Sequence, residues 1–267
     1  MKAAILQHGR AVAAFVIRDF SLVRRYLGWE SVWIVYTVVS ILTIGFIGVD
    51  QGDDELVVFL MVGGLLWGFL STLFHTLAES VAWEMWEGTI EYTFMAPISR
   101  SAFLVGSCAF AVLYGLIRTV AILAAVILLF GISLANANVT SAVVILVASS
   151  LSFVGLGLIA AVLPMFSPER GSQTAHILQA LVLLVSGVYY DVDVLPGWLQ
   201  PFSKVSPATY TLRAMRGALI DGRGLGEMRG TLVLLFVFAV VLIPVGYAAF
   251  TWGETHARRA GKLKRSG

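Results

Sequence analysis

The chain has 267 residues, of which 58% are hydrophobic and only 13% are charged, and its mean hydropathy is +0.88. A soluble domain averages about 25% charged residues, so the composition excludes an ordinary soluble protein and indicates several membrane crossings. The net charge of +2 matters only through its distribution between loops. The single cysteine, Cys108, excludes a disulfide framework and a thiolate metal site within the chain, and we expect no metal site and no nucleic-acid partner.

Residues 1–28 predict an amphipathic helix that lies in the membrane interface. A set of apolar residues follows helical spacing, and three arginines share another face. A basic leader that only sets the orientation is the alternative, and both interpretations place the segment in the cytoplasm. Arginines interrupt the apolar run, so we do not expect a signal peptide. The apolar residues are Val12, Phe15, Val16, Phe20, Val23 and Leu27, and the arginines are Arg10, Arg18 and Arg25.

Six apolar segments are predicted to span the membrane, because a span needs about 20 helical residues. The expected fold is therefore an all-α polytopic membrane protein with six transmembrane helices and a single permease domain over residues 1–267. The predicted spans are Trp29–Val49, Leu56–Ala78, Ala102–Gly131, Thr140–Phe166, Ser172–Tyr189 and Gly230–Trp252.

The distribution of lysines and arginines predicts that both termini are cytoplasmic. With the N-terminus inside, twelve of the 18 basic residues fall in cytoplasmic segments, and the first two outer loops have none. This bias is the one that orients membrane proteins. We therefore expect a multi-pass protein of the cell membrane (inner or plasma membrane).

The stretch Trp83–Arg100 predicts a short surface helix over residues 83–94, on the cytoplasmic side. Trp83, Trp86, Ile90 and Phe94 share one face, and Glu84, Glu87 and Glu91 share the neighbouring face. Pro97 would end the helix. An acidic amphipathic helix between two spans indicates a docking surface for a cytoplasmic partner.

Residues 190–229 predict a re-entrant or interfacial hairpin on the outer face. Ser206 and Pro207 open a helix as N-cap and first residue. The stretch Pro207–Ile220 would extend only about 21 Å, which is too short to cross the membrane.

The chain has no G-x-x-x-x-G-K-[ST] phosphate loop and no H-E-x-x-H zinc motif, and its four histidines are scattered. We therefore expect no enzymatic activity and no cofactor in the chain itself. Energy for any transport would come from a separate subunit.

Three polar residues within the spans are candidates for a translocation path: Arg118, His176 and Gln179. Arg118 would line the path, pair with Asp191 or Asp193 of the outer segment, or extend its head group to the outer interface as a structural residue. His176 and Gln179 share a face and form either a polar cavity wall or interhelical hydrogen bonds. His75 and Glu79, one turn apart, are expected to brace the surface helix.

Two motifs resemble those of type-2 ABC export permeases. The first is Glu87-Gly88-Thr89-Ile90-Glu91 followed by Ala96-Pro97-Ile98-Ser99-Arg100, which resembles the cytoplasmic loop motif of that family. The second is Ser186-Gly187, Leu195-Pro196, Ser206-Pro207-Ala208-Thr209-Tyr210 and Arg216, which resembles its outer hairpin. The chain departs from the family at Met85-Trp86, where a basic residue is usual.

The resemblance implies a permease for a hydrophobic or amphipathic substrate (a drug, a lipid or a lipid-linked molecule). It implies a homodimer or pseudodimer, with two cytoplasmic ATPase subunits that bind ATP and magnesium. Residues 83–94 would be the coupling helix, and the hairpin would gate the exit. The implied ATPase-docking residues are Glu84, Glu87, Gly88, Thr89, Glu91 and Arg100, and the implied gate residues are Pro196, Pro207, Tyr210 and Arg216.

Two other classes of function stay open on the sequence. A secondary transporter or channel would need a coupling-ion site with acidic residues near mid-membrane, and the predicted spans show none there. A membrane assembly subunit without transport activity would leave the outer hairpin without a purpose.

Overall fold

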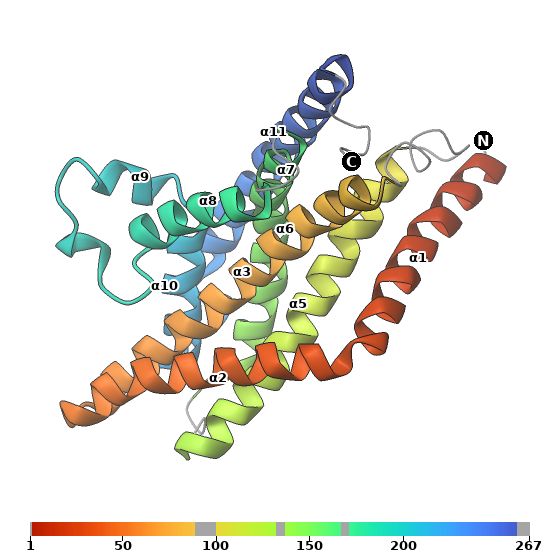
Figure 1. The fold of residues 1–267 in the computed structure, drawn as a ribbon. Helices are drawn as coiled ribbons and strands as arrows, with labels where there is room; N and C mark the ends of the chain where they lie inside the picture. Colours follow the sequence, from red (N-terminus) through yellow and green to blue (C-terminus); the bar gives the residue numbers. More distant parts are fainter. Residues whose placement is uncertain (1, 89–99, 132–136, 167–170, 261–267) are drawn as a thin grey trace.

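The structure is a computed structural model that describes residues 2–88, 100–131, 137–166 and 171–260. Every regular element in these ranges is a helix, which confirms the all-α prediction for them (Figure 1). The helices in chain order are α1 (Lys2–Arg25), α2 (Leu27–Asp50), α3 (Asp54–Glu87), α5 (Arg100–Phe130), α6 (Val139–Ala160), α7 (Leu163–Phe166), α8 (Gly171–Ser186), the 3-10 turn η1 (Val192–Val194), α9 (Gln200–Lys204), α10 (Pro207–Leu219) and α11 (Arg229–Arg259).

Five segments of the described chain are long and apolar enough to cross a membrane: α2, α3, α5, the α6–α7 stretch and α11. They correspond to five of the six predicted spans. The remaining one, α8, has 16 residues and extends about 24 Å, less than the hydrocarbon core of about 30 Å. The fifth predicted span, Ser172–Tyr189, therefore stays a prediction.

Local capping signals set several helix ends. The Asp53 side chain accepts a hydrogen bond from the Leu56 main-chain nitrogen at 3.0 Å and so caps α3. Asn138 caps α6 in the same way through the Ser141 nitrogen, also at 3.0 Å. The predicted fourth span is interrupted, because α6 ends at Ala160 and the short α7 follows.

The long helix α3 lies at the centre of the bundle. In its most apolar window 67% of the residues are buried, against 17% in α5 and in α11. Its buried phenylalanines, Phe69 and Phe74, pack in one core with Phe103 of α5, Phe153 of α6 and Phe250 of α11. The apolar faces of α2, α5 and α11 that point away from α3 are exposed.

Helices α6 and α11 approach closely through glycines. A Cβ atom added to Gly155 would lie 2.6 Å from the Leu242 carbonyl carbon, and one added to Gly246 would lie 2.5 Å from the Gly155 oxygen. Backbones this close admit no side chain between them, as in many small-residue contacts of membrane helices.

Helix α1 packs along the first half of α5. The rings of Phe15 and Phe103 lie 5.4 Å apart, and those of Phe20 and Phe110 lie 5.0 Å apart. Because both residue numbers rise together, the two helices run in the same direction, side by side (Figure 1). The placement of this amphipathic helix in the membrane interface stays a prediction.

The bundle has two ends that matter for function. At the terminal end, α1 begins, α3 ends, α5 begins and α11 ends (Figure 1). At the hairpin end lie the turn between α2 and α3, the start of α6, and residues 187–228. A main-chain hydrogen bond joins the start of α6 to the end of α10 in the hairpin, since the Asn138 nitrogen donates to the Ala218 oxygen at 2.8 Å.

Candidate functional site

An ion pair attaches α1 to the last turns of α3 at the terminal end. Arg18 Nη1 donates to Glu84 Oε1 at 2.7 Å, and its Nε donates to Asp19 Oδ1 at 2.8 Å. Glu84 and Asp19 are each 7% exposed. Burial raises the pKa of the Asp19 carboxyl, and although Arg18 lowers it, the pKa stays above its ordinary value. Glu84 is therefore buried and bound by Arg18 rather than exposed, and its role in docking an ATPase stays a prediction.

The predicted separate helix over residues 83–94 is wrong in its first half. Residues 83–87 continue α3 without a break, and α3 ends at Gly88, whose φ of 71° is left-handed. Glycine adopts this conformation at little cost, so it commonly ends helices. Glu87 is exposed, as the docking prediction requires. Thr89 and Glu91 lie outside the described residues, and Arg100 is the first residue of α5, with its side chain outside the description.

Four polar residues from α3 and α8 form one connected group, which we call the histidine cluster: His75, Glu79, His176 and Gln179. His75 Nε2 lies 3.1 Å from Glu79 Oε1, and the rings of His75 and His176 stack with centroids 6.0 Å apart. His176 Nδ1 lies 3.1 Å from Gln179 Oε1, and Gln179 Nε2 donates to the Ser71 oxygen at 3.3 Å. The structure thus joins two residue pairs that the sequence left separate.

Arg118 faces α2 rather than the hairpin. Its Nη2 donates to the Trp33 carbonyl oxygen at 3.3 Å and contacts Thr37 Oγ1 at 3.2 Å. One turn earlier, the Tyr114 hydroxyl donates to the Glu30 carboxylate. The predicted pairing of Arg118 with Asp191 or Asp193 is therefore wrong. Because main-chain and hydroxyl oxygens of a neighbouring helix bind Arg118, its position indicates a structural tie between α5 and α2.

Arg216 of α10 holds the turn that follows α8. It donates to the Gly187 oxygen at 3.0 Å, to the Val188 oxygen at 2.6 Å and to the Phe59 oxygen at 3.4 Å. Its guanidinium carbon lies 3.4 Å from the centre of the Phe59 ring. Burial lowers the pKa of Arg216 to about 10, against the opposing charge of Asp191. One side chain thus ties α3, α8 and α10 together at the hairpin end.

The other predicted hairpin residues have structural contacts. Pro207 begins α10 as predicted, but the Ser206 hydroxyl pairs with Ser186 Oγ at 2.8 Å instead of capping that helix. The Tyr210 hydroxyl donates to the Lys204 oxygen at 2.9 Å. Pro196 turns the chain into α9, with its oxygen accepting from the Leu199 nitrogen at 2.8 Å.

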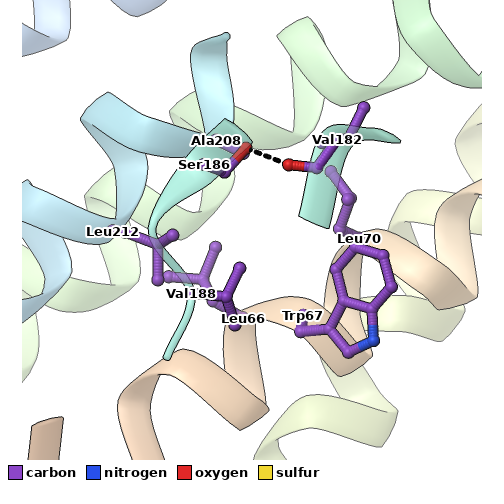
Figure 2. A pocket seen from close by; sticks show the side chains of 8 residues that line it. All are labelled: Leu66, Trp67, Leu70, Val182, Ser186, Val188, Ala208 and Leu212. Atoms are coloured by element: carbon purple, nitrogen blue, oxygen red, sulfur yellow. Dashed lines mark hydrogen bonds between the residues drawn. The ribbon is translucent and has the colours of Figure 1, made fainter. Parts of the chain in front are cut away.

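A small apolar pocket lies between α3, α8 and α10 (Figure 2). Figure 2 shows Leu66, Trp67 and Leu70 of α3 on one side of it, with Ser186 opposite, where its hydroxyl donates to the Val182 oxygen at 2.6 Å. Its cavity volume is about 10 Å³, room for about one water molecule and far below the roughly 300–1,000 Å³ that is usual for drug-sized ligands. This pocket therefore does not hold a drug-sized molecule as it stands.

Sequence reasoning missed several partners of the predicted residues. The i, i+4 spacing of His75 and Glu79 is a local signal for their contact, whereas the predicted bracing of the surface helix stays a prediction. Nothing local indicates that Arg18 reaches Glu84, or that His176 stacks on His75, because these partners are 66 and 101 positions apart in the sequence.

Comparison with known proteins places the chain in a family. The profile of the ABC-2 type transporter family matches residues 11–220. The chain is 33% identical over 75 residues to the probable doxorubicin resistance ABC transporter permease protein DrrC of Mycobacterium tuberculosis, which covers 27% of each chain. It is 26% identical over 122 residues to the linearmycin resistance permease protein LnrN of Bacillus subtilis, which covers 45% of this chain and 31% of LnrN.

These alignments span only about a quarter to a third of the relatives' lengths, whereas the family match covers most of this chain. The same region contains α2, α3, α5, the α6–α7 stretch, α8 and the hairpin as far as the end of α10. The chain is thus a multi-pass membrane permease, and it belongs to the ABC-2 type transporter family.

Proposed function

We propose that the chain is the membrane-spanning subunit of an ATP-driven exporter in the cell membrane. Two copies would form the transport path, and two separate ATPase subunits would bind and hydrolyse ATP. Both termini would be cytoplasmic, which agrees with the excess of lysines and arginines in the segments at the terminal end. In the assembled subunit α8 and the turn that follows it would form the fifth crossing, which brings the number of crossings to six.

The observation that carries this proposal is the junction at the terminal end. Helix α3 runs for 34 residues, about 51 Å, so it extends well past a hydrocarbon core of about 30 Å. The ATPase would contact exposed Glu87 and the following residues 88–100. Any displacement there passes directly into α3 and α5, the helices on either side. Because Arg18 binds Glu84, α1 would move with α3.

The substrate path would run along the α3–α8 face, between two copies of the chain. The pocket under the hairpin is too small for a drug-sized molecule, so one copy does not supply the path. The histidine cluster lies on the same face and gives it polar groups. The hairpin, tied down by Arg216, would close the outer end until ATP binding shifts the helices. This is a two-state scheme in which nucleotide favours one state through one docking element.

The proposed cargo is a hydrophobic or amphipathic organic molecule. The apolar pocket lining and the exposed apolar residues of α8 support this class. The relatives DrrC and LnrN are named for doxorubicin and linearmycin resistance, which supports export of drug-like molecules by this chain as well.

The decisive experiment measures ATP turnover in membranes that contain the chain, its cognate ATPase, or both. We expect turnover to depend on the complex. Charge reversal of the docking residues, Glu87→Arg with Glu91→Arg, should abolish copurification of the ATPase and lower turnover at least tenfold. The matched control is Glu55→Arg, an exposed carboxylate at the opposite end of α3, which should leave both unchanged.

Two results would reject the proposal. If the double charge reversal leaves complex formation and turnover intact, residues 87–91 do not dock an ATPase. If the chain alone moves a fluorescent amphiphile across vesicles along an ion gradient, without ATPase or ATP, it is a secondary transporter.

A further inference from the structure

The histidine cluster has a fixed set of hydrogen-bond donors and acceptors. The Ser71 oxygen, a main-chain carbonyl, can only accept, so Gln179 turns its amide nitrogen to Ser71 and its oxygen Oε1 to His176. His176 Nδ1 must then carry the proton that this amide oxygen accepts. Gln179 is only 5% exposed, so packing holds the arrangement in place.

The same reasoning fixes His75. A carboxylate only accepts hydrogen bonds, so His75 Nε2, which lies 3.1 Å from Glu79 Oε1, carries the proton. In the neutral rings, the remaining nitrogens, Nδ1 of His75 and Nε2 of His176, are acceptors. The second oxygen of Glu79 is an acceptor too, and it carries negative charge.

The cluster is open to a ligand. The side chains of His75 and Glu79 are 44% and 40% exposed, and His176 is exposed. Among the described residues these three acceptors, which come from two helices, have no other hydrogen-bond partner, and one of them is charged. A complementary ligand has several N–H donors and a positive charge.

We propose that the histidine cluster binds the protonated amino group of a cationic amphiphile. Glu79 would supply the charge-assisted hydrogen bond, and Nε2 of His176 would accept from another N–H group of the ligand. The apolar part of the ligand would lie on α8, where Ile177 and Leu181 are 63% and 56% exposed. This inference rests on the proposed export function and narrows its cargo to primary or secondary amines with an apolar body.

The test measures direct binding to the full chain in phosphatidylcholine nanodiscs, without ATPase or ATP. The probe is dansylcadaverine, a fluorescent primary amine. Two derivatives separate the effect of the positive charge from that of the N–H donors. The N-acetyl derivative has no charge, and the trimethylammonium derivative keeps the charge but has no N–H at that nitrogen. We expect the amine to bind at least about tenfold more tightly than either derivative, because each lacks one part of the charge-assisted hydrogen bond.

Variants assign the binding to the cluster. Glu79→Gln keeps the shape and removes the charge, and it should weaken amine binding about tenfold or more while leaving binding of the N-acetyl derivative unchanged. His176→Phe keeps an aromatic ring stacked on His75 and removes one hydrogen-bond acceptor. It should therefore weaken amine binding by a smaller factor than Glu79→Gln does. Glu55→Gln, at the other end of α3, is the control and should bind as the wild type does.

Equal affinity for the amine and its trimethylammonium derivative would overturn the inference, since acceptors would then play no part. Unchanged amine binding by Glu79→Gln, or no binding of any probe, would overturn it as well. None of these results bears on ATPase docking, which turnover measures separately. Conversely, if ATP turnover does not depend on the complex but the amine still binds, the proposed exporter function is rejected and the proposed amine site is retained.

Discussion

Arg18 Nη1 lies 2.7 Å from Glu84 Oε1, which joins the middle of α1 to the final turns of α3. The same guanidinium binds Asp19, so one cation serves two buried carboxylates. The pair lies a few residues before the chain leaves α3 toward the proposed docking segment. It is the contact through which the N-terminal helix takes part in any movement of α3.

Arg18→Ala should destabilise the protein by about 1–3 kcal/mol, because it leaves the buried Glu84 carboxylate with one partner fewer. Thermal unfolding of the purified chain measures the loss. Arg10→Ala, an exposed arginine of the same helix, is the control and should change little. The double variant Arg18→Met with Glu84→Met should recover the part of the loss that comes from Glu84, since apolar residues can replace a buried ion pair, while Asp19 still lacks its cation. Equal unfolding temperatures for Arg18→Ala and Arg10→Ala would show that the pair contributes nothing.

Asp19 should make stability depend on pH in a direction opposite to that of an ordinary paired carboxylate. Burial, with a further contribution from the charge of Glu84, raises the pKa of Asp19 above its ordinary 3.8, despite Arg18. The folded state therefore binds the Asp19 proton more tightly than the unfolded state does. The stabilisation of the folded state by this proton is complete below about pH 3.8 and is lost as the pH rises through the raised pKa of Asp19.

The measurement for Asp19 compares unfolding free energies of the wild type and Asp19→Asn across this range. The wild type should lose stability relative to Asp19→Asn as the pH increases, and at neutral pH the variant should be at least as stable. A difference that grows in favour of the wild type with rising pH would mean that Arg18 outweighs the cost of burial.

Local patterns were sufficient for much of the fold. Apolar runs located the five long helices to within a few residues at most ends, and Pro207 correctly marked the start of α10. The end of α3 had a local signal in Gly88, but the apolar face continuing to Ile90 and Phe94 argued for one helix across it. Here a single backbone residue decided against the side-chain periodicity, because its left-handed conformation ends the helix.

The candidate site was less accessible to sequence, because its contacts are between distant segments. Glu84 is spaced like an exposed docking residue, but it is buried and bound by Arg18 of α1. Of the alternatives left open for Arg118, pairing with Asp191 or Asp193 does not occur, because Arg118 meets the Trp33 carbonyl oxygen, and main-chain acceptors have no sequence signature. The histidine cluster required two helices to be placed side by side before its residues formed one group.

Gly63→Ala should disturb the hairpin end strongly. A Cβ atom at Gly63 would lie 2.0 Å from the Val188 oxygen and 3.2 Å from Arg216 Nη2, so α3 and the turn after α8 would have to separate. We expect a loss of about 1–3 kcal/mol, typical of overpacking, measured by thermal unfolding. Gly68→Ala on the same helix is the control, because its Cβ would meet Thr37 at an ordinary 3.5 Å. If both variants unfold at the wild-type temperature, the close approach at Gly63 is not required.

Arg216→Lys should loosen the hairpin without unfolding the bundle. The guanidinium bonds the oxygens of Gly187, Val188 and Phe59 and stacks on the Phe59 ring, and a lysine ammonium can reproduce neither the fork nor the stacking. Hydrogen exchange of the amides in residues 187–206 should therefore become faster, by about tenfold or more if one to two charged hydrogen bonds are lost. Arg213→Lys is the control, since Arg213 is exposed on the same helix and should leave exchange unchanged.

Because the bonds of Arg216 join three helices at the proposed exit, faster exchange with unaltered thermal unfolding would separate a role in closing the hairpin from a role in overall stability. Unchanged exchange in Arg216→Lys would show that the turn after α8 is held by its other contacts, among them the Ser186–Ser206 hydrogen bond.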